Sequence, residues 1–176
     1  ELEQEKAALL SRKQELYRSA NRHDLPLLTP GQKVEVYRKL FRGRQDVYAV
    51  RWQSSGGRSG YAVACANEWM PVICQKPRIK CGECRHKNFK PLDFDAVYDH
   101  LSGKHVTGLY PLLPDSSCYL LAADFDKGDW KANVRALAQA CRGEGVPYLM
   151  EVSRSGAGAH LWVFFSEAVQ ASSARR

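Results

Sequence analysis

The sequence lacks any apolar run that approaches the roughly 18 residues needed to cross a bilayer, which excludes a transmembrane helix and a membrane partner. It begins with Glu-Leu-Glu-Gln-Glu and so lacks the basic and apolar segments of a secretory signal, and we expect a cytoplasmic location. It contains no internal repeat and no low-complexity tract. With 44% hydrophobic and 26% charged residues, the chain has the composition of a folded protein and not of a disordered one.

The sequence also lacks an initial Met, and residues 167–176 resemble the first turns of a helix. We therefore expect these 176 residues to be a piece of a longer polypeptide. This length suits one medium domain, or one domain with a small additional module.

Acidic residues are fewer than basic ones, 19 against 26, and the excess is unevenly placed. Residues 33–90 contain 13 basic and 4 acidic residues, whereas the rest of the chain contains 13 basic and 15 acidic residues. This asymmetry predicts a polyanion-binding surface beside a part that uses carboxylates, although a merely solvated basic face is the alternative. The candidate nucleic-acid-binding residues are Arg78, Lys80, Arg85 and Lys87.

Four of the six cysteines fall within 20 residues of one another: Cys65, Cys74, Cys81 and Cys84. In a reducing compartment, clustered cysteines bind metal more often than they form disulfides. Tetrahedral zinc binds thiolates, and Cys81-Gly-Glu-Cys84 provides the tight half of such a site. We predict structural Zn²⁺, with His86 as an alternative fourth ligand and disulfides or incidental thiols as alternatives to zinc.

The pattern of apolar residues predicts a mixed α/β (α+β) fold. In the first part we expect a thin helix over residues 1–20, a connector to residue 31, a short helix opened by Thr29-Pro30-Gly31, and a β-hairpin of residues 46–52 and 58–64. After the cysteines we expect a helix at 93–101, strands at 106–113 and 118–123, a helix capped by Asp129, and strands at 146–152 and 159–165. The run at 118–123 is apolar throughout, as in a central strand covered on both faces.

Asp124 and Asp126 end the most apolar strand of the chain. Side chains two residues apart in a strand point the same way, so these carboxylates share a face and are able to hold one or two hard cations. A bare DxD is weak evidence, because loops between strands and helices are rich in Asp that only forms turns and caps.

A second motif links the last two expected strands, from Ser153 to His160. Gly156 and Gly158 permit unusual backbone angles, which lets the N–H groups of this turn converge on an anion. Ser155 adds a hydroxyl donor, Arg154 a fixed positive charge, and His160 an imidazole for phosphate contact or proton transfer. Taken alone, the segment also fits an ordinary turn with a surface histidine.

Together these segments resemble the archaeo-eukaryotic primase superfamily, whose first motif is DxD and whose second is similar to S-G-x-G-x-H. The resemblance is nearest to the primase domain of TOTE conflict systems and covers about residues 33–170. It rests on the segments Leu-Phe-Arg-Gly-Arg at 40–44, Cys-Ala-Asn-Glu-Trp at 65–69, His-Leu-Ser-Gly at 100–103, Leu-Tyr-Pro-Leu-Leu at 109–113, Ala-Asp-Phe-Asp-Lys at 123–127, and Ser153 through Trp162.

The resemblance implies an RRM-like catalytic half over residues 93–176, preceded by an N-terminal helix and linker (1–31) and a helix, hairpin and zinc module (32–92). It further implies that Asp124 and Asp126 hold Mg²⁺ or Mn²⁺, that Ser155, Gly158 and His160 contact the incoming nucleotide, and that the zinc site lies near the template. The family completes its metal site with an acidic residue on a later strand, and Glu167 follows the second motif too closely to take that place. We therefore expect these residues alone to bind nucleotide with metal but to polymerise poorly or not at all.

The resulting hypothesis is a primase-polymerase domain for replicating nucleic acid, with a DNA or RNA template-primer and nucleoside triphosphates as substrates, and with a fused helicase or similar domain. One alternative is a non-catalytic zinc-dependent nucleic-acid-binding module. A second is a DxD glycosyltransferase, against which the basic, cysteine-rich part argues, because a nucleotide-sugar enzyme needs no polyanion surface.

Overall fold

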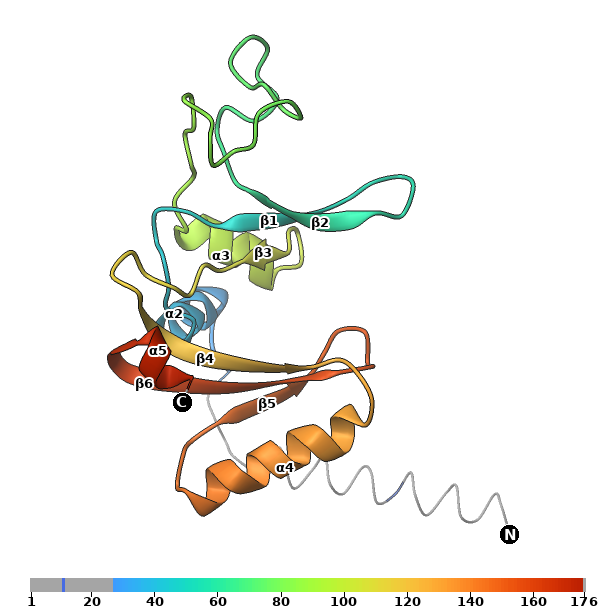
Figure 1. Ribbon diagram of the computed structural model, residues 1–176, viewed down its shortest axis with the longest axis vertical. Coiled ribbons are helices and arrows are strands. Elements are labelled where there is room, and N and C mark those ends of the chain that lie inside the picture. The colour runs from blue at the N-terminus through green and yellow to red at the C-terminus, as the bar shows by residue number, and fades with distance from the viewer. Residues whose placement is uncertain (1–10, 12–26, 176) are drawn as a thin grey trace.

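A computed structural model describes residues 27–175 and Ser11. It contains two three-stranded antiparallel sheets, one in each half of the chain (Figure 1). The predicted mixture of helices and antiparallel strands is confirmed. The helix predicted over residues 1–20 lies outside the described residues, apart from Ser11.

The first half opens with helix α2, Pro30–Leu40. Its start follows the predicted signal, because the Thr29 hydroxyl accepts from the Gln32 N–H while the Gln32 side chain accepts from the Thr29 N–H. Strands β1, Ala49–Gln53, and β2, Ser59–Val63, then form the predicted hairpin. The first sheet has the order β2-β1-β3.

Helix α3, Phe94–Leu101, is capped by the side chain of Asp93 and packs against α2. The small core between them contains Val34, Leu92, Ala96 and Val97. The domain division at residue 92 stays a prediction; α3 and β3, which follow that residue, pack with elements that precede it.

The strand predicted at 106–113 is wrong in its length, because β3 comprises only Thr107–Gly108. Leu109 turns inward against the α2–α3 core, and Pro111 has no N–H with which to continue a ladder. The carbonyl of Tyr110 instead accepts from the N–H of Arg44 at 2.9 Å.

The segment of residues 65–90, which we call the cysteine segment, projects beyond the hairpin as irregular loops (Figure 1). Its one ladder contact is an isolated antiparallel bridge between Cys65 and Phe89, which closes the base of the segment. The hairpin therefore carries the cysteines, as the sequence predicted.

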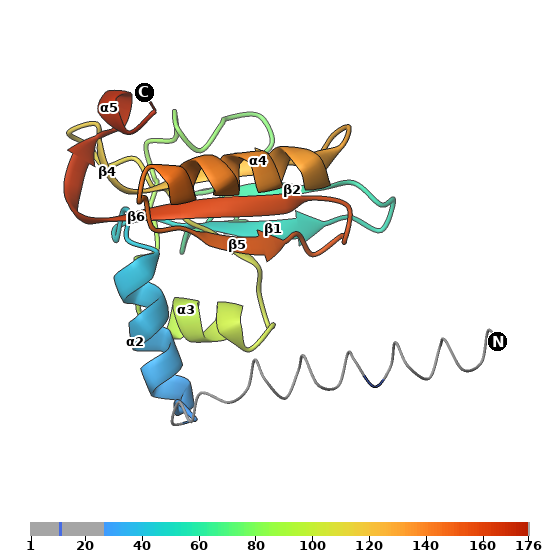
Figure 2. The same cartoon turned by 90° about the horizontal axis from the view of Figure 1, so that it is seen from below.

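The second half contains β4, Ser117–Phe125, α4, Trp130–Gly143, β5, Leu149–Val152, β6, Ala159–Gln170, and the four-residue α5, Ala171–Ala174. Its sheet has the order β4-β6-β5. Helix α4 is capped by Asp129 as predicted and covers one face of this sheet (Figure 2). The core on that face includes Val134, Ala138, Ala159 and Leu161.

Two expectations for this half are wrong. The apolar run at 118–123 belongs to an edge strand, since β6 takes the central position. Its apolar residues are nevertheless partly covered on both faces: Ala123 packs toward α4, and Leu120 lies opposite Phe164, which contacts Phe41 of the first half. Ala122, on the face opposite α4, is exposed. Residues 167–170 continue β6, with Val169 and Gln170 paired to β4, so the terminal helix begins only at Ala171.

The end of α2 joins the two halves on the sheet face opposite α4. The Phe41 ring meets Trp162 edge-on with centroids 5.1 Å apart, and Arg42 donates to the carbonyl of Phe165 at 2.7 Å. The guanidinium of Arg42 also lies 3.8 Å from the centroid of the Tyr119 ring. No helix among the described residues is both long and apolar enough to span a membrane.

Candidate active site

Three polar side chains form a row across the second sheet. Asp124 on β4 and Glu151 on β5 are each directly paired with His160 on the central strand β6. Paired residues of antiparallel strands project from the same face. The neighbours Ala123, Ala159 and Leu161 pack toward α4, so the row lies on the opposite face.

The imidazole of His160 lies between the two carboxylates. Its Nδ1 is 2.8 Å from Oε1 of Glu151, and its Nε2 is 3.4 Å from Oδ1 of Asp124. An ionised carboxylate only accepts, so the shorter contact requires a proton on Nδ1. The side chains of Asp124 and Glu151 are 66% and 56% exposed, whereas that of His160 is 30% exposed, so the acids are open to a ligand while the ring is held.

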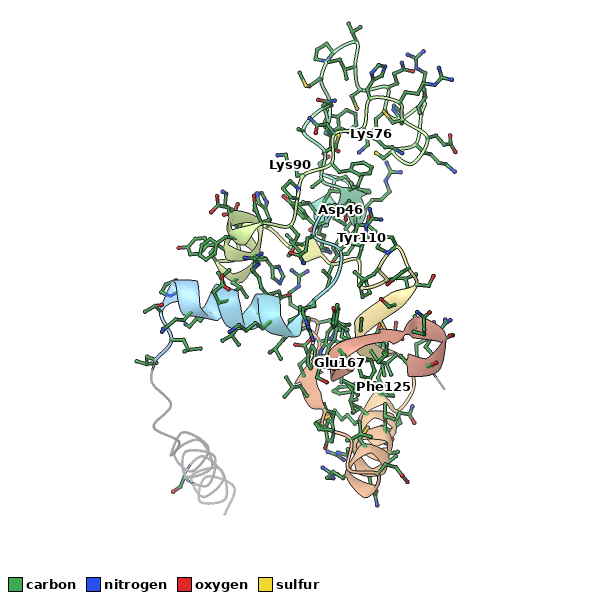
Figure 3. The ribbon with its side chains drawn as sticks, turned by 90° about the vertical axis from the view of Figure 1, so that its left-hand side faces the viewer. Asp46, Lys76, Lys90, Tyr110, Phe125 and Glu167 are labelled. Atoms are coloured by element: carbon green, nitrogen blue, oxygen red, sulfur yellow. The ribbon has the colours of Figure 1, made fainter. Side chains whose placement is uncertain are left out.

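Asp126 follows the end of β4 and is exposed. It is adjacent to Gly158, because a Cβ on Gly158 would lie 2.6 Å from the carbonyl oxygen of Phe125 and 3.4 Å from Cα of Asp126. Only a residue without a side chain permits this approach. Gly158 thereby brings the turn of residues 153–158 against the DxD motif, and the two predicted motifs meet. Figure 3 places Phe125, which separates the two aspartates, at the end of β4 above α4.

The turn itself is held by hydrogen bonds that the sequence did not predict. The N–H of Gly156, which has φ 73°, donates to the carbonyl of Ser153, and the N–H of Ala157 donates to Oγ of Ser155. These two N–H groups are therefore engaged within the turn and do not converge on an anion as expected. The Ser155 hydroxyl and the Arg154 side chain are exposed, which leaves side chains as the donors for a phosphate.

The row is bordered by aromatic side chains from both halves. The rings of His160 and Trp162 have centroids 5.6 Å apart. Burial, together with the nearby charge of Glu151, raises the pKa of Tyr37 on α2. Tyr37 stacks on Phe41, whose ring meets Trp162 edge-on, so aromatic side chains at the end of α2 border this face of the sheet.

The cysteine segment brings its four cysteines to one small cavity, of about 20 Å³, which is also lined by His86. The N–H of His86 points at Sγ of Cys84, and the N–H of Asn88 points at Sγ of Cys65, each at 3.4 Å. All six cysteines are free thiols. The four sulfurs line one cavity but are not arranged as metal ligands. In the described part of the chain, no three metal-binding side chains lie close enough together to hold an ion.

The candidate nucleic-acid-binding residues all lie on the cysteine segment and are exposed: Arg78, Lys80, Arg85 and Lys87. Lys76 differs, because its ammonium is partly buried and contacts Oε1 of Glu68 at 2.8 Å. Figure 3 shows Lys76 where the cysteine segment meets the hairpin.

A sequence model of the TOTE conflict system archaeo-eukaryotic primase domain matches residues 32–176. The chain belongs to this primase family. The family performs primase-type nucleotidyl transfer, and this implies nucleic acid and nucleoside triphosphates as substrates. No curated protein and no solved structure matches the chain.

Glu151 is the residue of this primase domain that sequence reasoning missed. A signal was present, because a turn of residues 153–158 pairs Val152 with Ala159 and hence Glu151 with His160. The position of Tyr37 had no such signal, since it depends on how the end of α2 packs against a sheet more than 100 residues later.

Proposed function

We propose that this primase domain transfers a nucleotide from a nucleoside triphosphate to a 3′-hydroxyl on a template. The 3′-oxygen loses its proton to solvent water and bonds to the α-phosphorus. The bond from that phosphorus to the oxygen that bridges it to the β-phosphorus breaks, and pyrophosphate leaves. The observation that carries the proposal is the row Asp124–His160–Glu151 beside the turn of residues 153–158.

Asp124 and Asp126 are the residues that would hold Mg²⁺ or Mn²⁺. Their exposed carboxylate oxygens are the ligands that hard divalent cations prefer, and they leave room for water and phosphate oxygens. When bound, the cation supplies positive charge against the charge that develops on the phosphates during transfer.

The turn and His160 would hold the triphosphate. Arg154 and the Ser155 hydroxyl are exposed donors on the turn, Gly156 and Gly158 give it its shape, and His160 adds a ring nitrogen on the adjacent strand. Glu151 is a positioning residue, because its contact with Nδ1 directs Nε2 of the imidazole toward Asp124. These groups bind and orient, which is the larger part of catalysis in phosphoryl transfer.

Structural Zn²⁺ in the cysteine segment is the second part of the proposal. Thiolates at Cys65, Cys74, Cys81 and Cys84 make a suitable donor set, and N–H groups directed at sulfur stabilise thiolates. Binding would require the four sulfurs to move together within their shared cavity. The metal would then fix a loop segment that carries the exposed basic residues toward a template, and a helicase fused elsewhere in the polypeptide would supply unpaired strands.

Binding of triphosphate in the presence of Mn²⁺ tests the catalytic part. Asp124→Asn is expected to abolish Mn²⁺-dependent triphosphate binding in calorimetry, because it removes a ligand charge while keeping the side-chain shape. His160→Ala is expected to weaken triphosphate binding with less effect on Mn²⁺.

Asp129→Asn is the matched control, since it removes the same charge five residues away and Asn also caps helices. It should bind as the parent does. Parental binding of Mn²⁺ and triphosphate by Asp124→Asn would contradict the catalytic proposal.

A non-catalytic nucleic-acid-binding module is the second candidate. It is favoured by the exposed basic side chains of the cysteine segment, which are able to contact phosphates without any catalytic site. Such a module predicts oligonucleotide binding with no Mn²⁺-dependent triphosphate binding at all.

A further inference from the structure

A groove of about 460 Å³ lies between the β1–β2 hairpin and the start of the cysteine segment, well apart from the acidic row. Its lining is Val50, Trp52, Ala62, Glu68, Trp69 and Lys76. Its volume is in the range of sites that hold small organic groups. Neither the metal-binding residues nor the triphosphate-binding turn contributes to it.

The floor of the groove is one face of the hairpin. Val50 is paired with Ala62, and Trp52 with Gly60. A Cβ on Gly60 would lie 3.1 to 3.3 Å from three adjoining atoms of the Trp52 indole, so the ring packs against the glycine backbone. Trp52 is nevertheless 45% exposed, which leaves part of the ring accessible.

The wall of the groove is Trp69, which is 68% exposed. Its φ of 61° is a left-handed conformation that is costly for a large side chain, and such conformations concentrate at binding sites. The ammonium of Lys76 lies 5.7 Å from the centroid of its ring. The groove thus combines two exposed indoles with the Lys76–Glu68 ion pair.

We propose that this groove binds unpaired bases of a nucleic-acid strand by stacking on Trp52 and Trp69. An aromatic face stacks on any base, so such a site is tolerant of sequence. Charge complementarity favours this occupant: residues 33–90 carry 13 basic and 4 acidic residues, and exposed Arg78 and Lys80 follow Lys76 along the same segment. Phosphates would contact these cations while the bases enter the groove. The inference rests on the proposed role of the cysteine segment in template binding, and it adds the recognition of bases to that of phosphates.

Binding of single-stranded oligonucleotides to the full chain tests this inference. The probes are oligo-dT and oligo-U, to separate DNA from RNA, and an abasic strand of equal length with the same phosphates. Trp52→Ala and Trp69→Ala are each expected to weaken binding of the strands that carry bases about tenfold. The slope of log affinity against log salt should not change, because no phosphate contact is lost. The abasic strand should bind weakly to the parent, and both variants should bind it with the same weak affinity as the parent.

Tyr61→Ala is the matched control. It removes an exposed aromatic ring from the same hairpin, but this ring packs on Gly108 of β3, away from the groove. Trp52→Phe should retain most of the affinity, which separates stacking from a loss of folding.

Parental affinity in both Trp→Ala variants would overturn the inference, as would equal binding of the abasic strand. A change of oligomeric state in place of a change of affinity would also overturn it, since the groove would then be an interface between copies. Charge reversal of the exposed basic residues could abolish strand binding while the Trp→Ala variants bind as the parent does. That result would refute this inference and leave the proposed function standing. If no oligonucleotide binds to the parent, both fail.

Discussion

Nδ1 of His160 lies 2.8 Å from Oε1 of Glu151, and the two residues face each other across the β5–β6 ladder. The contact fixes which ring nitrogen carries the proton in the neutral imidazole and turns the other toward Asp124. A residue of the DxD motif is thereby linked, through one histidine, to an acid that neither motif contains.

Replacing Glu151 tests this link. Glu151→Ala is expected to release the imidazole ring and to lower the fraction of the Nδ1-protonated tautomer in nitrogen NMR. Triphosphate binding should weaken about fivefold, since one partly exposed hydrogen bond contributes about 1 kcal/mol. Glu151→Gln keeps an acceptor oxygen and should restore most of the tautomer preference. A tautomer distribution that is the same in all three proteins would rule out the positioning role.

Two glycines of the turn make a matched pair. Gly158→Ala would place a Cβ 2.6 Å from a backbone oxygen, so we expect it to displace Asp126 from the turn, to lower the free energy of unfolding by about 1–3 kcal/mol and to weaken Mn²⁺ binding. Gly156→Ala meets no atom but has φ 73°, so it should cost about 1 kcal/mol and leave Mn²⁺ binding intact. Urea unfolding and Mn²⁺ titration measure both. Equal Mn²⁺ affinities in the two variants would show that the close approach at Gly158 does not position the metal-binding residues.

The sequence predicted well where local signals determine structure. The caps at Thr29 and Asp129, the hairpin around residues 54–57 and the turn before His160 all depend on residues a few positions apart. The edge position of β4 could not be read from residues 118–123, because an apolar run indicates burial and not the place of a strand within its sheet. Here α4 covers one face and α2 contributes to the other, and that packing is a property of the whole chain.

The candidate site divides in the same way. Asp124, Asp126 and the turn carry recognisable motifs, whereas the register that sets Asp124 opposite His160 spans a helix and another strand. The groove with Trp52 and Trp69 had no sequence signal, since single tryptophans are usually core residues.

Removal of metal should unfold the cysteine segment. The segment has few large buried apolar residues, so its folding free energy depends on the proposed zinc. Elemental analysis is expected to find one zinc per chain in protein purified without chelator, and Cys81→Ser/Cys84→Ser should lose it together with protection from proteolysis between residues 65 and 90. Cys141→Ser, on α4, is the control and should keep both. Protein without zinc whose cysteine segment resists protease would refute this prediction.

Binding to single strands should be sensitive to salt, because the whole positive excess lies in residues 33–90. Each phosphate that a cation neutralises contributes a slope of about −0.7 to log affinity against log salt. Arg78→Glu, Lys80→Glu and Lys87→Glu together should therefore make the slope less negative by about 2, because three exposed cations are lost. Arg135→Glu reverses an exposed charge on α4, beyond the basic segment, and should change neither slope nor affinity. If the triple variant keeps the parental salt slope, other residues make the phosphate contacts. If Arg135→Glu alters the slope in the same way as the triple variant, net charge alone, and not the cysteine segment, attracts the strand.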